Sequence, residues 1–294
     1  MELDEYQRRA NLTDQRPGRD DAALVFPLMG LASEVGSLLN QYKKRVRDGE
    51  AHSLFSDRIA EELGDVMWYV SNLASKLDLS LESLAHLNLK RIGERWPLAD
   101  GDPPSWLLDE EFPTLEQLPR QASVTFTEIE ENGRPRVRLT WNGAEIGNPL
   151  SDMAWEGDDY RFHDAFHLTY AALLGWSPRS RSFFGRRRQS DERLEEIEDS
   201  GRAKVVEEAV SILAFEYARK ERFLEGVEQI DYSILTLVTD MVAGFEVRIR
   251  TVREWERAIL RSFDMWRDLR THHGGRLDLD LVARTIAFVP DAND

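Results

Sequence analysis

Carboxylates stand inside two helical repeats of apolar residues in the first third of the chain, and this feature restricts the fold most strongly. Over residues 56–77 apolar side chains recur at helical spacing, and Glu62 and Asp65 border that stripe on one side, about one turn apart. A preceding repeat over residues 24–45 carries Glu34 at its border. Carboxylates held together repel one another unless a cation neutralises them. The pattern therefore favours a hard divalent ion such as Mg²⁺, with Mn²⁺ as the alternative.

The signals around these repeats predict a helical domain over residues 1–97. Residues 3–10 form a short helical candidate, and a polar stretch with a Pro-Gly pair follows it as a lead-in arm. A third long helix is predicted from Ser80, which serves as the N-cap, to about residue 95, just before Pro97.

An ordered set of motifs runs through this domain. The motifs are Tyr6-Gln7, Gly30-Leu31-Ala32 with Glu34 and Gly36, Lys43-Lys44, Ala60-Glu61-Glu62-Leu63-Gly64-Asp65-Val66 with Trp68 and Tyr69, and Asn88-Leu89-Lys90 with Arg95. In this order they resemble the MazG-like all-α nucleoside triphosphate pyrophosphohydrolases, over roughly the first third of the chain. The resemblance implies an all-α bundle that pairs with a second copy, as a homodimer or higher homo-oligomer. It also implies Mg²⁺-dependent cleavage of a nucleoside triphosphate into the monophosphate and pyrophosphate.

The acidic pattern of that family is Glu-x-x-Glu on one helix and Glu-x-x-Asp on the next. Glu62 and Asp65 match the second pair, and Glu34 matches the first position of the first pair. Ser37 stands where the other glutamate is expected, and a hydroxyl is a neutral and weaker ligand for Mg²⁺. This departure leaves two hypotheses about the function of the chain. The chain is either a pyrophosphohydrolase or a catalytically weakened nucleotide-binding sensor or interaction protein whose C-terminal domain carries the output.

Named roles follow from this alignment. The metal ligands are expected at Glu34, Glu62 and Asp65, and any of these or Glu61 is a candidate to orient the attacking water. Acidic residues in a first helical turn are also favoured by the helix dipole, which is the alternative account of Glu61 and Glu62. The candidates for substrate contact are Lys44, Trp68, Asn88, Lys90 and Arg95. Lys44 is equally explained as a solvated C-terminal charge, and Trp68 as a helix-packing or dimer contact.

Beyond Pro97 the composition changes. Residues 98–121 are rich in proline and are expected to form a linker. Residues 122–150 hold two alternating runs on either side of Asn132-Gly133, which predicts a short β-hairpin segment. Residues 151–294 are expected to form a second, mostly helical domain that includes a capping box at Thr251 and a final short helix near residues 280–288. The expected fold class is mainly α.

A second polar cluster is predicted in this half. His163 and His167 are four residues apart on one predicted helix, and Glu207 and Glu208 lie on a later helix that can face them. The set fits either a transition-metal site or buried polar residues bonded between helices. Between these elements, the arginines of residues 179–188 are expected to form a solvated basic loop.

Charge and composition narrow the surroundings. A formal net charge of −16 argues against broad nucleic-acid binding, because affinity for polyanions comes from Lys and Arg. The chain has no cysteine, and no uninterrupted apolar run approaches the length of a membrane span. The N-terminus is acidic where a signal peptide would be basic and then apolar. We therefore expect a cytoplasmic protein with no membrane partner.

Overall fold

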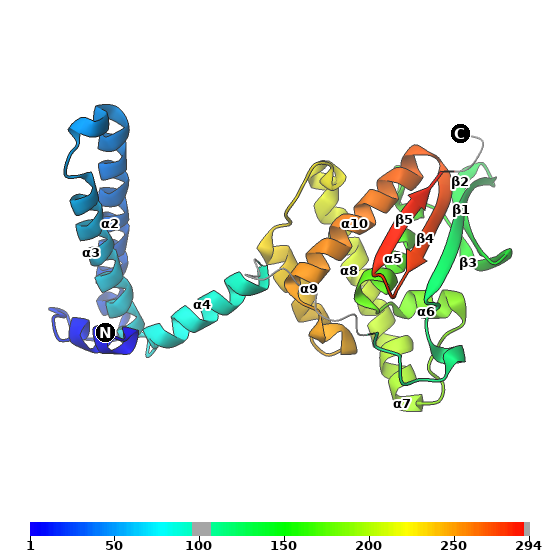
Figure 1. Cartoon of the computed structure of the whole chain (residues 1–294), viewed down its shortest axis with the longest axis horizontal. Helices are drawn as coiled ribbons and strands as arrows, with labels where there is room; N and C mark the ends of the chain where they lie inside the picture. Colours follow the sequence, from blue (N-terminus) through cyan, green and yellow to red (C-terminus); the bar gives the residue numbers. More distant parts are fainter. Residues whose placement is uncertain (96–106, 291–294) are drawn as a thin grey trace. The chain divides into compact units, whose positions relative to one another are not determined.

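The computed structural model describes residues 1–95 and 107–290, with the backbone alone at residues 94 and 95 (Figure 1). The chain divides into two compact units, Met1–Leu98 and Ala99–Asp294. Each unit is described by itself.

The N-terminal unit is helical, as the sequence predicts. Its elements are α1 (Leu3–Asn11), α2 (Asp21–Asp48), a 3-10 turn (Gly49–Ala51), α3 (Phe55–Lys76) and α4 (Leu81–Arg95). Helices α2 and α3 run side by side as a long hairpin, and α1 packs against α3 and α4 (Figure 1). Ser80 caps α4 as expected, because its hydroxyl accepts a hydrogen bond from the Ser83 backbone N–H at 3.1 Å.

Close contact between α2 and α3 depends on a glycine. The ring of Tyr69 on α3 lies against Gly30 on α2, and a Cβ at this glycine would stand 2.2 Å from a ring carbon. The lead-in arm is fixed to α3 by a buried ion pair, in which Lys76 Nζ contacts Asp14 Oδ2 at 2.7 Å. Glycine is therefore needed at the hairpin contact, and the arm is part of the unit.

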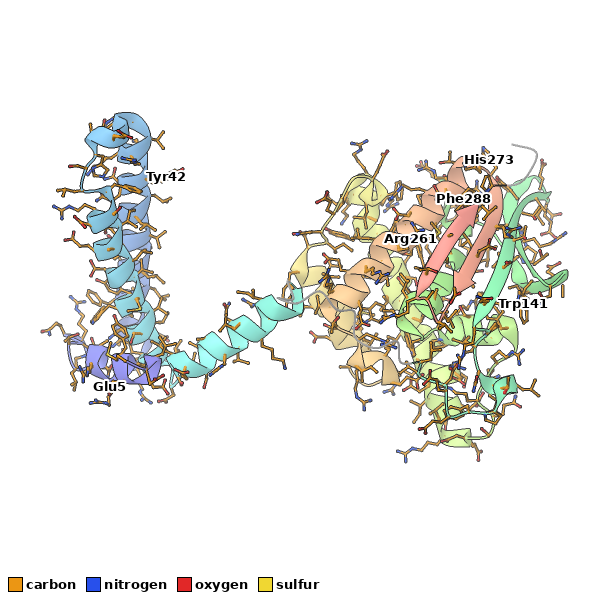
Figure 2. All side chains as sticks on the ribbon, viewed as in Figure 1. Glu5, Tyr42, Trp141, Arg261, His273 and Phe288 are labelled. Carbon is orange, nitrogen blue, oxygen red and sulfur yellow. The ribbon has the colours of Figure 1, made fainter. Side chains whose placement is uncertain are left out.

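The apolar stripes of α2 and α3 are only partly covered. Apolar side chains on α2 that remain exposed are Val25, Leu28, Met29, Val35, Leu39, Tyr42 and Val46, and on α3 they are Leu63, Met67 and Val70. Tyr42 is labelled on this hairpin in Figure 2. One copy of the chain does not bury these stripes, because two helices cover only one side of each other.

One helical stretch in the described part of the chain, Asp21–Ala51, is long and apolar enough to cross a membrane by length and composition. Its apolar window has a mean hydropathy of 1.7 and is 6% buried within the chain. The sequence expectation considered only uninterrupted apolar runs and so overlooked it. A single such helix is weak evidence of membrane insertion, since signal sequences and core helices of soluble proteins satisfy the same criterion.

The C-terminal unit is built on a five-stranded antiparallel sheet of order β3-β2-β1-β4-β5. The strands are β1 (Gln121–Glu131), β2 (Arg134–Trp141), β3 (Ala144–Leu150), β4 (Gly274–Asp280) and β5 (Thr285–Val289). The predicted hairpin is confirmed as β1 and β2, joined by Asn132 and Gly133 with φ angles of 55° and 72°.

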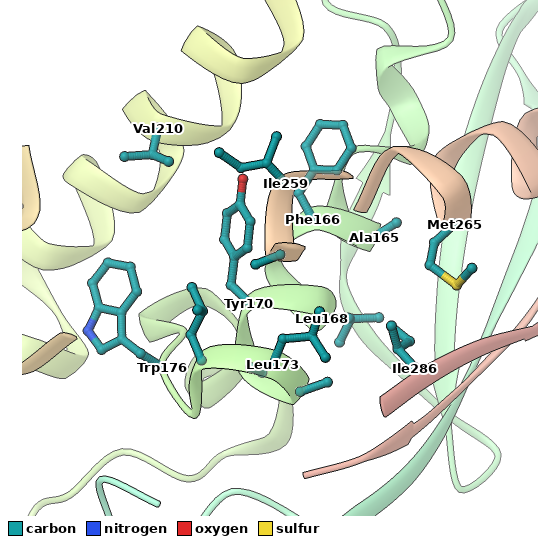
Figure 3. Close-up of a cluster of buried hydrophobic side chains, with 14 of the residues drawn as sticks. Ala165, Phe166, Leu168, Tyr170, Leu173, Trp176, Val210, Ile259, Met265 and Ile286 are labelled. Atoms are coloured by element: carbon teal, nitrogen blue, oxygen red, sulfur yellow. The ribbon is translucent and has the colours of Figure 1, made fainter. Parts of the chain in front are cut away.

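Helix α5 is the buried helix of this unit. The helices of the unit are α5 (Asp164–Leu174), α6 (Pro178–Phe184), α7 (Glu192–Leu194), α8 (Gly201–Lys220), α9 (Tyr232–Val242) and α10 (Val252–Thr271). Every residue of α5 is buried, and the helix packs against α10, α6, α8, β4 and β5. Figure 3 shows Phe166, Leu168 and Tyr170 of α5 within this core. The predicted capping box of Thr251 and Glu254 begins α10.

Two expectations about this half were wrong. The predicted short helix at residues 280–288 is instead the end of β4, a turn and β5. The period-2 alternation of residues 276–289 is the signal that was missed. The sheet is also larger than a short hairpin, because Leu277 of β4 pairs with Val124 of β1. Gly274 permits this pairing, since a Cβ there would lie 2.6 Å from the Phe126 carbonyl oxygen.

The predicted boundaries between linker, hairpin and helical domain also differ from the structure. Residues 122–150 share one sheet with β4 and β5, so they do not form a separate segment. Residues 98–106 of the predicted linker lie outside the described residues. After them, Leu107, Leu108 and Leu118 are buried in the core of the C-terminal unit. This part of the predicted linker therefore belongs to the folded unit.

Two arginines of the predicted basic loop, Arg181 and Arg188, belong to a buried ion-pair network. Arg188 is fully buried, and its guanidinium contacts Asp199 at 2.6 Å and Glu246 at 2.7 Å. Arg181 is buried beside it and contacts Asp109 at 2.9 Å. Composition alone suggested solvated charges, but the acidic partners come from segments distant in sequence, which a local pattern does not reveal.

Candidate functional site

Three predicted ligands meet between the paired helices of the N-terminal unit. Glu34 extends from α2, and Glu62 and Asp65 extend from α3. One carboxylate oxygen from each lies within 4.8 Å of the others. Their spacing follows from the helical repeat, which places the two α3 residues one turn apart on the side that faces Glu34.

The charge of this cluster is not balanced by the protein. Among the described residues, no Lys or Arg forms an ion pair with any of the three carboxylates. Burial, followed by the nearby charges of Asp65 and Glu62, raises the pKa of Glu34 above its usual range. Oxygen ligands with excess negative charge are what Mg²⁺ and Mn²⁺ require, so the residues present fit such an ion.

Other residues around the cluster have defined positions. Gln41, which is buried on α2, donates a hydrogen bond from Nε2 to Glu62 Oε1 at 3.2 Å. Sequence reasoning missed Gln41, although the sequence places it two helical turns after Glu34 and therefore on the same side of that helix. Glu61 lies outside the cluster, because its exposed carboxylate pairs with Arg58 at 2.8 Å. Ser37 is half-buried one turn after Glu34, where a longer acidic side chain would approach the carboxylates.

The predicted substrate-contact residues are dispersed. Trp68 packs edge-on against Tyr69, and its indole N–H donates to the Thr13 hydroxyl at 2.8 Å, so it ties the lead-in arm to α3. Lys44 lies half-buried near the end of α2. Asn88 and Lys90 are exposed on α4, which packs against α1, and within the described residues no hydrogen bond or ion pair joins them to the carboxylates.

Two further motif positions need comment. The side chain of Arg95 lies outside the described residues. Gln7 has a structural role that the motif alone did not indicate. It donates to the Leu79 carbonyl and accepts from the Leu81 backbone N–H, each at 2.8 Å, and so holds the connection between α3 and α4.

The second predicted cluster comes together in the C-terminal unit. His163 immediately precedes α5 and His167 is on α5; both rings approach Glu208 of α8, and His167 also contacts Glu207. Asp164 joins them, with one oxygen within 4.8 Å of a nitrogen of each ring. Sequence reasoning named the two histidines and two glutamates but not Asp164, although Asp164 directly follows His163 in the chain.

The electrostatics of this cluster are dominated by burial and by the carboxylates. Burial lowers the pKa of His167, but Glu207 and Glu208 outweigh it and raise that pKa to about 10. Burial also acts on Glu208, but the neighbouring His167 and His163 lower the Glu208 pKa to about 2. For His163, burial prevails and lowers the pKa. In the protein alone, His167 is therefore charged and His163 is neutral at neutral pH.

The fold and the first cluster define a class: a mainly helical protein with a carboxylate site on paired helices. Comparison with known proteins gives the family. A family model described as the MazG C-terminal domain matches residues 104–292, and the chain belongs to this family. The MazG-like resemblance seen in the sequence is thus supported, but by the C-terminal part of the chain and not by its first third.

One curated relative is similar to a smaller part of the chain. The Gene 37 protein of Mycobacterium phage L5 is 39% identical over 101 residues, which cover 32% of this chain and 89% of that protein. No solved structure matches the chain significantly.

Proposed function

We propose that the N-terminal unit hydrolyses nucleoside triphosphates, standard or modified, to the monophosphate and pyrophosphate in a Mg²⁺-dependent reaction. The observation that carries the proposal is the meeting of Glu34, Glu62 and Asp65, with no cationic partner within the part of the chain that the structure describes. Membership of the chain in a MazG family supports the same reaction class. The place of action we propose is the cytoplasm.

The proposed chemistry assigns roles to these side chains. Glu34, Glu62 and Asp65 would hold Mg²⁺, which when bound neutralises phosphate charge. A carboxylate of the same cluster orients the attacking water and accepts its proton, as hydrolysis of the bond between the α and β phosphates requires. Gln41 keeps Glu62 in position through its hydrogen bond.

The exposed apolar face of α2 and α3 supports a homo-oligomer. Soluble proteins rarely leave a continuous apolar stripe in water, and a second hairpin of the same kind would cover it. The substrate contacts proposed for Asn88 and Lys90 fit an assembly as well, since α4 does not bring them to the carboxylates of the same copy. We therefore propose a homodimer or higher homo-oligomer as the active form.

Pyrophosphate release tests the proposed reaction. We expect release from at least one nucleoside triphosphate with Mg²⁺ or Mn²⁺, and a loss of about 100-fold or more in Glu62→Ala and Asp65→Ala. The matched control is Glu61→Ala, which removes a carboxylate outside the cluster and retains activity. No release from any triphosphate in a broad panel would contradict the proposal.

Ser37 supports a second candidate function, a nucleotide-binding sensor or interaction protein. In this case the wild-type chain binds a triphosphate with Mg²⁺ but does not cleave it. Ser37→Glu adds the carboxylate that the family pattern includes, and we expect it to raise Mg²⁺ affinity about 10-fold, measured by calorimetry. Unchanged affinity would show that residue 37 does not reach the metal.

A further inference from the structure

The C-terminal unit contains a group of buried polar atoms that have charged neighbours but no hydrogen-bond partner among the described residues. Asp164 Oδ1, His167 Nε2 and Arg179 Nε are each shielded from solvent and form no hydrogen bond. His167 is 0% exposed and Asp164 is 2% exposed. Buried polar atoms are nearly always paired, because an unpaired one costs about 1–3 kcal/mol. Three such atoms around one point indicate that something else belongs there.

The hydrogen bonds of the two rings prepare both Nε2 atoms as ligands. His163 donates from Nδ1 to the Tyr160 carbonyl at 2.9 Å, and its ring is also stacked on Tyr160. His167 donates from Nδ1 to Glu207 Oε1 at 2.9 Å. Metal-binding histidines characteristically donate their other ring N–H to a carbonyl or carboxylate, which fixes the ring and its tautomer. Each Nε2 can therefore present a lone pair to a metal.

The four atoms around this point have the spacing of metal ligands. His163 Nε2 lies 3.9 Å from Asp164 Oδ1 and 3.8 Å from Glu208 Oε2. His167 Nε2 lies 4.0 Å and 3.3 Å from the same two oxygens, in the latter case without hydrogen-bond geometry. Ligands of a tetrahedral zinc ion are about 3.3 Å apart, as follows from bonds of about 2.0 Å. The three longer distances would have to shorten by about 0.5–0.7 Å to reach that spacing, so the ion would draw the ligands together.

The supporting carboxylate is itself firmly held. Glu207 is fully buried, and it accepts hydrogen bonds from the Ser177 hydroxyl at 2.5 Å and the Arg179 backbone N–H at 2.8 Å, besides that of His167. Its orientation is therefore independent of any ion. Such a fixed outer partner distinguishes a built metal site from a chance pair of histidines.

The charges also leave room for a dication. Asp164, Glu207 and Glu208 supply three negative charges when ionised, and Arg179, with Nε 3.4 Å from Glu208 Oε1, supplies one positive charge. With both histidines neutral, the sum is −3 + 1 = −2. A divalent ion would neutralise this group.

We propose that His163, His167, Asp164 and Glu208 form a binding site for a divalent transition-metal ion of the zinc class. Imidazole nitrogen favours such ions over Mg²⁺, so the site differs in chemistry from the carboxylate cluster of the N-terminal unit. Glu207 is a positioning residue for His167. The proposal is independent of the proposed pyrophosphohydrolase activity.

Co²⁺ binding to the full chain tests this site, after chelator treatment and without an affinity tag. We expect one equivalent of Co²⁺ to give the strong visible absorption of a tetrahedral site with nitrogen ligands, and Zn²⁺ to abolish it by displacement. His163→Ala and His167→Ala should weaken binding at least about 100-fold, and Glu207→Gln about 10- to 100-fold. Glu62→Ala and the surface change His86→Ala are matched controls that should leave the absorption unchanged.

Thermal unfolding keeps the test decisive if a histidine variant does not fold. Zn²⁺ should raise the melting temperature of the wild-type chain, and the chelator should reverse the rise, because the ion binds the folded state. Absence of both the absorption and the Zn²⁺-dependent rise in the wild type would overturn the proposal. The same absorption in folded His163→Ala and His167→Ala would also overturn it.

Discussion

In the N-terminal unit the candidate ligands are three carboxylates on two helices whose outer faces remain uncovered, whereas in the C-terminal unit two imidazoles and Asp164 are buried in the core and Glu208 is partly exposed beside them. The first cluster has one neutral hydrogen-bond partner, Gln41, and the second is held by Tyr160 and Glu207. The difference suggests that the N-terminal site gains its final form from substrate, ion and a second copy. The C-terminal site is prepared by folding alone.

The largest expected effect tests the closed character of the C-terminal unit. Arg188→Met leaves the buried Asp199 without its main partner, and we expect the unfolding free energy of this unit to fall by about 3–5 kcal/mol. The exposed change Arg219→Met, which removes a surface pair with Glu216, should cost less than about 1 kcal/mol. Calorimetry checks both. Equal stability of the two variants would show that the network is not a supporting element.

The next effect concerns the open character of the N-terminal unit. Leu39→Asp places a charge on the exposed apolar face, and we expect self-association to weaken about 30-fold or more. Leu115→Asp, at an exposed apolar residue of the C-terminal unit, is the matched control and should not change it. Sedimentation over a concentration series measures both. A wild-type chain that stays monomeric would contradict the proposed homo-oligomer.

A pair of glycines in α2 tests the contact that brings the carboxylates together. Gly30→Ala would place a methyl group in the ring of Tyr69, and we expect the N-terminal unit to lose about 1–3 kcal/mol. Gly36→Ala meets nothing within 4 Å, so helix propensity should raise stability by up to about 1 kcal/mol. Denaturant titration distinguishes the signs. Stabilisation in both variants would mean that Tyr69 does not pack on Gly30.

The smallest expected effect is a pH dependence in the C-terminal unit. Burial, with the charge of Glu246, raises the pKa of Glu198 to about 7. The folded state then binds more protons than the unfolded chain between about pH 4.5 and 7, so this group's contribution to stability is complete below that window and is lost as pH rises through it.

Glu198→Gln removes this titration. When the pH rises from 5 to 8, we expect the unfolding free energy of the wild type to fall by about 1–2 kcal/mol more than that of the variant. Thermal unfolding at the two pH values measures this difference. An equal change of stability with pH in both proteins would show that Glu198 does not titrate in this window.

Local patterns predicted the elements that are determined locally. The three long helices, the Ser80 cap, the Asn132-Gly133 turn and the Thr251 capping box all follow from spacing and from single-residue preferences. The meeting of Glu34 with the α3 carboxylates also follows from helical periodicity once the two helices are paired. These features need no knowledge of distant partners.

The features that sequence reasoning missed depend on distant partners. The alternation in β4 is short, and its place in the sheet depends on pairing with β1, from which it is more than a hundred residues away in sequence. From the sequence alone Arg188 was interpreted as a solvated charge, whereas in the structure it is paired with Asp199 and Glu246. The apolar repeats of α2 and α3 do not by themselves show how much of each stripe one copy of the chain buries.

The central claim is that the two units hold two separate sites of different chemistry. Pyrophosphate release and Co²⁺ absorption, measured side by side on wild type, Glu62→Ala and His167→Ala, test it most directly. We predict that Glu62→Ala loses pyrophosphate release and keeps the Co²⁺ absorption, while His167→Ala loses the absorption and keeps Mg²⁺-dependent release. Loss of both signals in either folded variant, or of neither, would contradict the claim.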